Sequence, residues 1–495
     1  MYSLGIDLGT SSVKVAVVAL ETGKCVASAQ YPETEAPVKS IQPGWAEQSP
    51  ADWWLYTCQA IRQLTSRPGI NAADIAAIGI AYQMHGLVVV DAQQRVLRDS
   101  IIWCDSRAVE IGEQAAVDLG QNYVQQNLLN SPGNFTASKL AWVKQHEPVV
   151  YNRIHTVMLP GDFIAMQLTG ETTTTLSGLS EGVFWDFGAE SLSERLMQHY
   201  GFDPAILPVP LPAFAIHGHL KNSVASELGL KAGLPVSYKA GDQPNNAFSL
   251  NVLEPGAVAA TAGTSGVIYG VSDRLAADPL SRINTFAHVN HHAGQLRTGV
   301  LLCINGTGSM YRWAREHFAP GLSYAELNSL AALASPGAAG LSVLPFGNGA
   351  ERMLGNRYTG AGLSGIDLNR HGRKEIFRAV QEGIVYAFRY GLDIMRENGL
   401  QPRIIRAGQA NLFLSDVFAQ AFVDVTGVPV ELYDTDGSTG AALGAAIGAS
   451  LYRSAPEAFS GHHCVRALEP RNSAVYEPLY AGWKNWLENE IRSTP

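Results

Sequence analysis

The stretch GIDLGTSSVKVAVV at residues 5–18 places a turn of glycine, threonine and serine between two apolar, strand-forming segments. A close copy of the turn returns in the second half of the chain, in TAGTSGVIYGV at residues 261–271. Each turn gathers backbone N–H groups and hydroxyls around one small volume, and its glycines leave room for a ligand to approach. One such turn alone is usually only a hairpin, so the repetition is the informative feature, and it predicts two similarly built domains.

Length and composition are those of a globular protein with two domains, a size that suits an enzyme. The chain has 495 residues, more than one hydrophobic core usually organises, with 46% hydrophobic and 9% aromatic residues. The formal net charge is −9 and no run of five basic residues occurs, so neither nucleic acid nor an anionic membrane is an expected partner. An anionic ligand would need local donors or a cation.

The cysteines and the amino terminus favour a reduced, cytoplasmic location. The five cysteines are scattered and form no CxxC pair, which argues against a disulfide framework and against a zinc site. The first residues, MYSLGIDLG, lack the basic start and the long apolar stretch of a signal peptide, and no run of about 18 apolar residues occurs. We therefore expect a cytoplasmic protein.

Strands and helices are predicted to alternate along the chain, which makes the expected fold class α/β. Ser49 as N-cap and Pro50 in the first helical position begin a helix that runs to residue 64. Further expected elements are strands at 75–82, 86–91 and 294–305, a hairpin at 256–271, and helices at 373–396 and 415–427. We place an N-terminal domain at 1–240 and a C-terminal, nucleotide-binding domain at 241–495, with 120–220 as an insertion in the first.

Two such turns facing each other across a cleft would hold different phosphates of one nucleotide, ATP, as a two-sided clamp. Asp7 precedes the first turn and could hold Mg²⁺ directly or through water, while Lys14 could neutralise charge on the transferred group. The expected phosphate-binding residues of the two turns are Thr10, Ser11, Ser12 and Lys14 in the first, and Gly263, Thr264 and Ser265 in the second.

A third segment is a candidate adenine site. RAGQANLFL at residues 406–414 precedes a predicted helix, and it contains the expected nucleotide-binding residues Gly408, Gln409 and Asn411. The run DGSTGAALGAAIGA at 436–449 offers a flat, small-residue surface that would suit an adenine ring. Small residues on a helix also simply allow close packing, and this second interpretation stays open.

These segments together resemble the FGGY family of carbohydrate kinases over nearly the whole chain. The resemblance implies the actin/Hsp70/sugar kinase fold, in which two ribonuclease H-like domains flank a deep cleft. The matching segments are the two phosphate turns, the two family signatures at 136–146 and 362–383, and the adenosine motif GAALGAA at 440–446. The sequence departs from the signatures at Asn134 and Gln381.

Two short segments resemble the sugar-binding segments of xylulokinases within that family. YQMHG at 82–86 implies that Met84 and His85 face the sugar, although an isolated histidine is usually structural. IIWCDSR at 101–107 implies that Trp103 and Asp105 lie against the sugar with Arg107 in support. A cysteine, Cys104, stands where asparagine is usual.

Asp242, in AGDQ at residues 240–243, is the expected catalytic base, because phosphoryl transfer needs the acceptor hydroxyl held in line with the γ-phosphate. We expect Asp242 and Gln243 to bind the sugar, and Asp7 and Asp242 to bind Mg²⁺. The structural alternative for Asp242 is a turn or cap. Gln243 makes this segment resemble the GDQ of glycerol kinases. However, YQMHG lacks the Arg-Glu pair that glycerol kinases have in the corresponding segment. The expected reaction is therefore phosphorylation of a ketopentose, D-xylulose to D-xylulose 5-phosphate.

Two alternatives stay open at this point. One is a kinase for glycerol, ribulose, gluconate or another polyol or sugar, and the other is an actin- or Hsp70-like nucleotide switch without sugar chemistry. The polar segments around His85, Trp103 and Asp242 argue against a switch, because a switch needs no polar cluster next to the γ-phosphate. Glu351 and Arg352 resemble the family's GERTP-like segment. They could form an ordinary salt-bridged loop or act directly in the site, and both interpretations stay open. Similar kinases are often homodimers, which is the warrant for expecting one.

Overall fold

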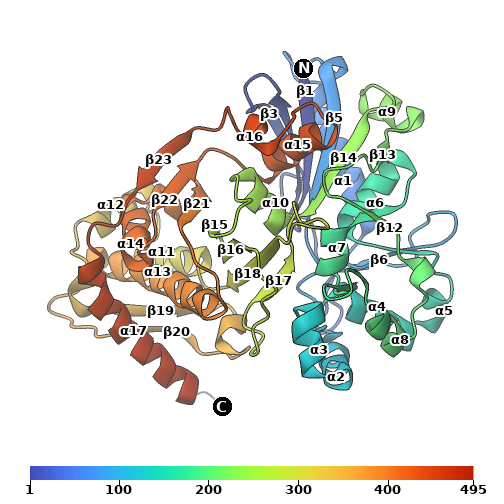
Figure 1. Ribbon diagram of the computed structural model, residues 1–495. Coiled ribbons are helices and arrows are strands. Elements are labelled where there is room, and N and C mark those ends of the chain that lie inside the picture. Colours follow the sequence, from blue (N-terminus) through green and yellow to red (C-terminus); the bar gives the residue numbers. More distant parts are fainter. Residues whose placement is uncertain (494–495) are drawn as a thin grey trace.

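The first of two large sheets belongs to the N-terminal half of the chain in the computed structural model, which describes residues 1–493 (Figure 1). Its six strands lie in the order β13-β14-β5-β1-β2-β3. They are β1 (Tyr2–Leu8), β2 (Val13–Ala19), β3 (Lys24–Tyr31), β5 (Ile75–Tyr82), β13 (Gly218–His219) and β14 (Pro235–Gly241). The strands β1, β2 and β3 form an antiparallel meander, whereas β5 runs parallel to both β1 and β14.

The second sheet repeats this design in the C-terminal half. Its seven strands lie in the order β17-β18-β16-β15-β21-β22-β23. They are β15 (Ala257–Ala262), β16 (Gly266–Ser272), β17 (Asn284–Ala287), β18 (Thr298–Ile304), β21 (Ile404–Gly408), β22 (Val430–Tyr433) and β23 (Cys464–Leu468). Here β15, β16 and β18 form the antiparallel meander, and β21 and β22 continue it in parallel. The repeated turn therefore belongs to a repeated topology, which confirms the expected α/β fold of two similar domains.

The predicted helices form with the predicted caps. The helix α1 (Pro50–Thr65) begins after Ser49, whose hydroxyl accepts from the Asp52 backbone N–H at 3.3 Å. In the second half, α14 (Asp416–Thr426) starts after the cap Ser415 and stops at Gly427, which has a φ of 68°. The long helix α13 (Arg373–Glu397) carries the expected apolar stripe and is buried along most of its length.

The chain between β5 and β13 forms a separate layer of short helices beside the first sheet. Its strands are β6 (Val88–Val90), β7 (Ser100–Ile101), β8 (Thr156–Met158), β9 (Thr173–Thr175), β10 (Trp185–Asp186), β11 (Ser191–Leu192) and β12 (Val209–Leu211), and β4 (Glu47–Gln48) pairs with β7. Its helices are α2 (Val109–Leu119), α3 (Gln121–Tyr123), α4 (Thr136–His146), α5 (Pro148–Tyr151), α6 (Pro160–Thr169), α7 (Leu176–Glu181) and α8 (Glu194–Tyr200), with a single π-helical turn at Val124–Leu128. This layer carries the residues that resemble a sugar-binding segment.

The remaining helices connect or cover the two sheets. They are α9 (Asn222–Leu228), α10 (Asp242–Ser249), α11 (Gly308–Phe318), α12 (Tyr324–Ala332), α15 (Gly437–Gly448), α16 (Ala455–Ala458) and α17 (Ser473–Ser493), and a small hairpin pairs β19 (Ser342–Phe346) with β20 (Gly360–Ser364). The edge strand β17 is bridged to the N-terminal half, because Asn130 both donates to the Thr285 carbonyl and accepts from the Thr285 N–H. Asn130 thereby joins the two halves of the chain.

The small-residue helix α15 packs against the N-terminal sheet although it comes late in the chain (Figure 1). A Cβ on Gly5 would clash with the backbone of Ser438, and a Cβ on Gly79 would clash with the backbone of Ala441. Glycine and alanine are therefore required on both sides of this contact, so that the helix can approach the strands closely. Of the two interpretations of the run at 436–449, close packing is the one that the structure shows.

A search of residues 1–493 finds no helix that combines the length and the apolar character needed to cross a bilayer.

Candidate active site

Two carboxylates lie at the ends of two strands of the N-terminal sheet. Asp7 lies near the end of β1, and Asp242 follows β14 directly as the first residue of α10. Both strands run parallel to β5 and lie on either side of it, so their carboxyl ends share one edge of the sheet. Ligands of open α/β sheets bind at this edge. The expected catalytic and metal-binding acids are thus brought together by the sheet.

Burial and neighbouring negative charge raise the pKa of both acids. Burial first, and then the negative charge of Asp436, raise the pKa of Asp7 to about 6. Burial, followed by the charge of Asp7, raises the pKa of Asp242 to about 7, although hydrogen bonds from Gln243 act in the opposite direction. Gln243 is therefore placed against the carboxylate of Asp242.

Asp436, the third carboxylate of this cluster, was not anticipated as a site residue. It caps α15, where its side chain accepts from the Thr439 N–H at 2.9 Å. The next residue, Gly437, lies against Asp7, because a Cβ there would clash with the Asp7 carboxylate. The helix-cap pattern DGST was visible in the sequence, but the pairing with Asp7 depends on α15 crossing to the other domain.

The first turn is connected to the expected sugar segments by side-chain hydrogen bonds. The indole N–H of Trp103 donates to the Thr10 hydroxyl at 2.9 Å, and that hydroxyl donates to the side chain of Gln83 at 3.0 Å. The Ser11 and Lys14 residues are exposed and Ser12 is half-buried. A residue expected to bind phosphate and one expected to bind sugar therefore touch each other.

His85 is held by its backbone in an unusual conformation. Its φ is 62°, in the left-handed region that is rare for residues other than glycine. The His85 N–H donates to Glu181 Oε1 at 2.9 Å, and the His85 Nδ1 lies 3.1 Å from the Glu181 carbonyl oxygen. The ring packs edge-on against Phe135 and at a tilt against Phe286. Burial, together with the positive charge of Lys139, lowers the pKa of His85 to about 3, so the imidazole is neutral.

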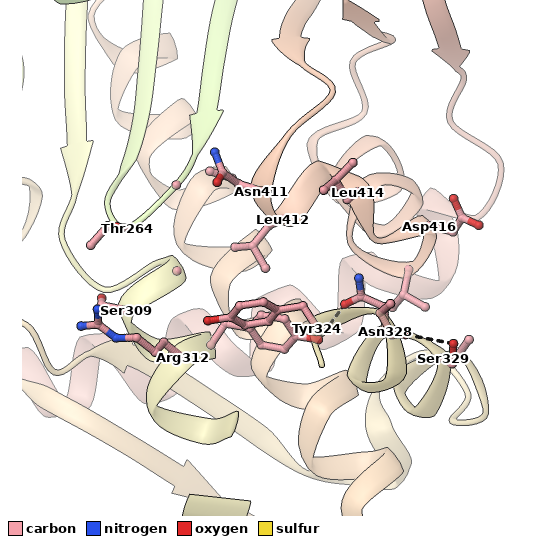
Figure 2. A pocket seen from close by; sticks show the side chains of 17 residues that line it. Thr264, Ser309, Arg312, Tyr324, Asn328, Ser329, Asn411, Leu412, Leu414 and Asp416 are labelled. Atoms are coloured by element: carbon pink, nitrogen blue, oxygen red, sulfur yellow. Dashed lines mark hydrogen bonds between the residues drawn. The ribbon is translucent and has the colours of Figure 1, made fainter. Parts of the chain in front are cut away.

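A cavity of about 720 Å³ opens in the C-terminal half beside the second turn (Figure 2). Thr264 of the turn lies at one end, Asn411 and Leu412 form one wall, and Gly263 also lines the cavity. The opposite wall comes from α11 and α12 and contains Arg312, Tyr324, Asn328 and Ser329, none of which the sequence singled out. Its mixture of apolar and polar residues and its size are those of a small-molecule site.

The second turn is fixed by the amino terminus of α11. The N–H of Gly308 donates to the Gly263 carbonyl at 2.9 Å, and the N–H of Ser309 donates to the Thr264 carbonyl at 3.1 Å. A Cβ on Gly308 would clash with the carbonyl of Gly263, so glycine is needed at this contact. Of the other expected nucleotide-binding residues, Ser265 belongs to the same turn, while Gly408 and Gln409 immediately precede the cavity wall in sequence.

The chain matches a known family over both halves. Residues 2–249 match the N-terminal domain, and residues 258–452 the C-terminal domain, of the FGGY family of carbohydrate kinases. The chain belongs to the FGGY family of carbohydrate kinases. It is therefore a sugar kinase whose phosphoryl donor, by its family, is ATP.

The chain is similar to xylulose kinases and to a gluconate kinase. The xylulose kinase of Escherichia coli strain K12 is 33% identical over 448 residues, covering 90% of this chain and 88% of that protein. A crystal structure of the xylulose kinase from Rhodospirillum rubrum superposes with a TM-score of 0.86 at 26% identity, covering 99% of each chain. The gluconate kinase of Lactobacillus acidophilus, at 21% identity and a TM-score of 0.89 over 100% of this chain and 99% of that one, shows the shared fold alone.

Lys139 of this kinase connects the two segments that were expected to bind the sugar. Its side chain is fully buried, and its ammonium donates to the carbonyl oxygens of His85 at 2.8 Å and Ile102 at 2.9 Å. Burial lowers the pKa of Lys139 to about 7, with the charge of Asp105 acting in the opposite direction. The family signature around Lys139 was visible in the sequence, but nothing local indicated where the ammonium would point.

Asp105 is fully buried and already has partners. Its carboxylate accepts from the Ala46 N–H at 2.6 Å and from the guanidinium of Arg107 at 2.7 to 3.0 Å. Arg107 in turn stacks on Trp45, with its guanidinium carbon 3.8 Å from the ring centroid. In the structure Asp105 therefore orients the loop that carries Trp103, and its contact with the sugar stays a prediction.

Met84 and Glu181 lie against Gly241, the residue before Asp242. A Cβ on Gly241 would come within 2.6 Å of the Met84 side chain and 2.8 Å of Glu181 Oε2. Burial raises the pKa of Glu181 well above its ordinary value, and the charge of Asp242 contributes to the same shift. Glu181 was not anticipated from the sequence, yet it links the strand end before Asp242 to the backbone of His85.

Proposed function

We propose that the protein transfers the γ-phosphoryl group of ATP to the 5-hydroxyl of D-xylulose, giving D-xylulose 5-phosphate and ADP. Support for the sugar comes from the Escherichia coli relative, a xylulose kinase at 33% identity over 90% of this chain. The YQMHG and WCDSR segments, which resemble xylulokinases, lie side by side on Lys139. YQMHG begins where β5 ends, and Trp103 bonds Thr10 just beyond β1, at the same edge of the sheet as Asp242.

The observation that carries the mechanism is the carboxylate pair of Asp7 and Asp242 at the strand ends. We propose Asp242 as the base that holds the sugar hydroxyl in line with the γ-phosphorus and accepts its proton as the bond to phosphorus forms. A base with a pKa of about 7 is matched to proton transfer near neutral pH. The position of Asp242 at the start of α10 also favours its negative form, because the helix dipole is positive there.

The same pair of acids fits a divalent cation. The charge of Asp436 raises the pKa of Asp7 and the charge of Asp7 raises the pKa of Asp242, so an excess of negative charge gathers here that a cation would neutralise. We propose that Asp7 and Asp242 hold Mg²⁺ together with phosphate oxygens of ATP, since Mg²⁺ is usually bound by one or two carboxylates plus substrate phosphates. The cation would supply charge neutralisation to the triphosphate.

For ATP we propose an orientation that follows the cavity. Adenosine would occupy the cavity between Asn411 and Tyr324, and the phosphates would reach past Thr264 toward the first turn. Backbone N–H groups of the two turns would then bind successive phosphates, with the hydroxyls of Thr10, Ser11 and Ser12 on one side and Ser265 on the other. Lys14, exposed beside the first turn, would face the transferred group.

The test is sugar-stimulated release of ADP by the purified protein with MgATP. D-xylulose, L-xylulose, D-ribulose, L-ribulose, D-fructose, gluconate and glycerol are compared, and the Asp242→Asn variant shows the background ATP hydrolysis. We expect D-xylulose to give the highest kcat/KM. A higher value for gluconate or glycerol would overturn the choice of sugar, and ATP binding without stimulation by any of these compounds would favour the nucleotide switch.

A further inference from the structure

Gln381, at which the sequence departs from the second family signature, contacts two residues that line the C-terminal cavity of about 720 Å³. It belongs to the long helix α13, and its side chain is fully buried. A buried amide needs partners for both its oxygen and its N–H groups, because an unpaired polar group costs free energy. The partners of Gln381 are Ser415, Tyr311 and Asn328.

The hydrogen bonds of Gln381 have a direction that is set by a backbone N–H. The N–H of Phe418 donates to the Ser415 hydroxyl at 3.3 Å, and that hydroxyl donates to Gln381 Oε1 at 2.8 Å. Because Ser415 uses the oxygen of the Gln381 amide, the nitrogen is the atom that faces Tyr311 and Asn328. Turning the amide over would leave the proton of the buried Ser415 hydroxyl without this acceptor.

Asn328 is the last residue of this series of hydrogen bonds. Gln381 Nε2 donates to the Tyr311 hydroxyl at 2.9 Å and to Asn328 Oδ1 at 3.1 Å. The Tyr311 hydroxyl donates to the same Oδ1 at 2.7 Å. Burial raises the pKa of Tyr311, so its phenol stays protonated and remains a donor. Two donors on one oxygen fix which way round the Asn328 amide lies.

The amide nitrogen of Asn328 is therefore left for a ligand. Within residues 1–493 it donates to no protein acceptor, whereas its oxygen accepts twice. Asn328 is half-buried on α12 and lines the cavity, and Figure 2 shows its amide nitrogen pointing into that space. A donor that is fixed in a pocket selects ligands that carry an acceptor at the matching position.

The lining around this donor suits a flat heteroaromatic ring. Leu412 and Val417 line the same cavity, and the ring of Tyr324 stacks on that of Tyr311 with the centroids 5.6 Å apart. Apolar and aromatic walls with one directed donor favour a base whose edge carries ring-nitrogen acceptors over a phosphate group.

We infer that Asn328 binds the adenine base of ATP, its amide N–H donating to a ring nitrogen, and that Gln381 is the positioning residue that fixes the orientation of this amide. The inference rests on the proposed function, because it takes the cavity as the adenosine site. It deepens that proposal by naming a residue that selects the base, separate from the turns that would bind the phosphates.

The experiment compares ATP with its 1-deaza, 3-deaza and 7-deaza analogues, each of which has C–H in place of one ring nitrogen. Isothermal titration calorimetry with Mg²⁺ and without sugar measures the Kd of each nucleotide, so binding is measured independently of the sugar reaction. We expect at least one analogue to bind the wild type roughly tenfold more weakly than ATP. That difference is called the deaza penalty below.

Asn328→Asp removes the donor alone. The carboxylate keeps an oxygen that accepts from Gln381 and Tyr311, but it has no N–H to offer to the cavity. ATP should bind roughly tenfold more weakly, and the deaza penalty should disappear. The control is Ser329→Asp, which places the same charge one position along α12 on the same cavity lining and should keep the deaza penalty.

Gln381→Leu tests the positioning role. An apolar side chain of similar size removes the hydrogen bonds to Tyr311 and Asn328, so the Asn328 amide is free to turn. The deaza penalty should fall below about threefold, while kcat at saturating ATP and the KM for D-xylulose stay within about twofold of the wild type. An unchanged deaza penalty in folded Gln381→Leu, with folding checked by a thermal melt, would overturn the positioning role.

The outcomes separate this inference from the proposed function. A wild type that binds none of the nucleotides overturns both, whereas one that binds them without sugar-stimulated turnover overturns only the proposed sugar reaction. If Ala325→Trp on the cavity wall leaves ATP binding unchanged, adenosine lies elsewhere, and the inference falls with the proposed orientation of ATP. Equal binding of all four nucleotides by the wild type, or a deaza penalty that persists in folded Asn328→Asp, overturns the inference alone.

Discussion

The ammonium of Lys139 donates a hydrogen bond of 2.8 Å to the backbone carbonyl of His85. On the other side of the same residue, the His85 N–H donates to Glu181 at 2.9 Å. The backbone of His85 is therefore held by a buried cation and a buried acid at once. This accounts for how a residue with a φ of 62° keeps one orientation, because the surrounding contacts over-determine a conformation that costs energy by itself.

Replacing Lys139 by methionine is expected to release both sugar segments. The carbonyls of His85 and Ile102 would lose their donor inside the protein, and the sugar KM should rise roughly tenfold or more while the KM for ATP stays within about twofold. The control is Lys144→Met on the same helix, where the ammonium bonds the Tyr200 carbonyl at 2.7 Å, far from the sugar segments. Equal increases in both KM values would mean that Lys139 supports the fold and not the sugar site.

Glutamine at position 181 is expected to be tolerated, and alanine is not. The pKa of Glu181 is raised well above its ordinary value by burial, so the side chain is neutral at neutral pH, and glutamine keeps both the neutral state and the acceptor for the His85 N–H. We expect Glu181→Gln to stay within a few-fold of wild-type kcat/KM and Glu181→Ala to lose roughly 10- to 100-fold. If glutamine were as damaging as alanine, the ability of Glu181 to ionise would be essential.

The Asp242→Asn variant should lose activity and gain stability. We expect kcat to fall roughly 10²- to 10⁴-fold with ATP binding retained. The raised pKa means that the folded state binds a proton more tightly than the unfolded chain, so the stability this group contributes is lost as pH rises toward 7. Differential scanning calorimetry without Mg²⁺ at pH 8 should therefore give a higher Tm for the variant. Wild-type turnover would remove Asp242 from the role of base.

Activity should rise with pH through the pKa of Asp242. The base must be unprotonated, so kcat/KM for the sugar at limiting Mg²⁺ should increase from pH 6 to pH 8 with a midpoint near the pKa of about 7. A cation bound by Asp7 and Asp242 favours their charged forms, so saturating Mg²⁺ should move the midpoint to lower pH. A midpoint that is independent of the Mg²⁺ concentration would argue against a metal on this pair.

A bulky side chain in the C-terminal cavity should raise the KM for ATP and leave the KM for the sugar unchanged. Ala325 lies on α12 at the wall of the cavity and is exposed, so Ala325→Trp fills space without disturbing the core. The KM for ATP should rise roughly tenfold or more through steric exclusion, with the sugar KM unchanged. Initial rates with each substrate varied in turn measure both values, and an unaffected KM for ATP would place adenosine elsewhere.

Local signals in the sequence were sufficient for much of the fold and for the position of the acids. Ser49, Ser415 and Gly427 mark helix ends through hydrogen bonds and backbone angles confined to a few residues, and each was found as expected. The repeated turn identified the repeated domain, because a hairpin is also formed by residues close in sequence. Asp7 could be chosen as the acid before the first turn, and Asp242 from the needs of phosphoryl transfer. Both lie at one edge of the sheet because parallel strands align their carboxyl ends.

Only the tertiary structure decided which distant groups act on these residues. The sequence by itself determined an α/β kinase of two repeated domains with Asp242 beside Asp7. It could not place the ammonium of Lys139 against the carbonyl of His85, or the cap of α15 beside Asp7. The physical reason is that burial and charge act through space, so the pKa and the orientation of each group depend on neighbours that the chain brings together only on folding.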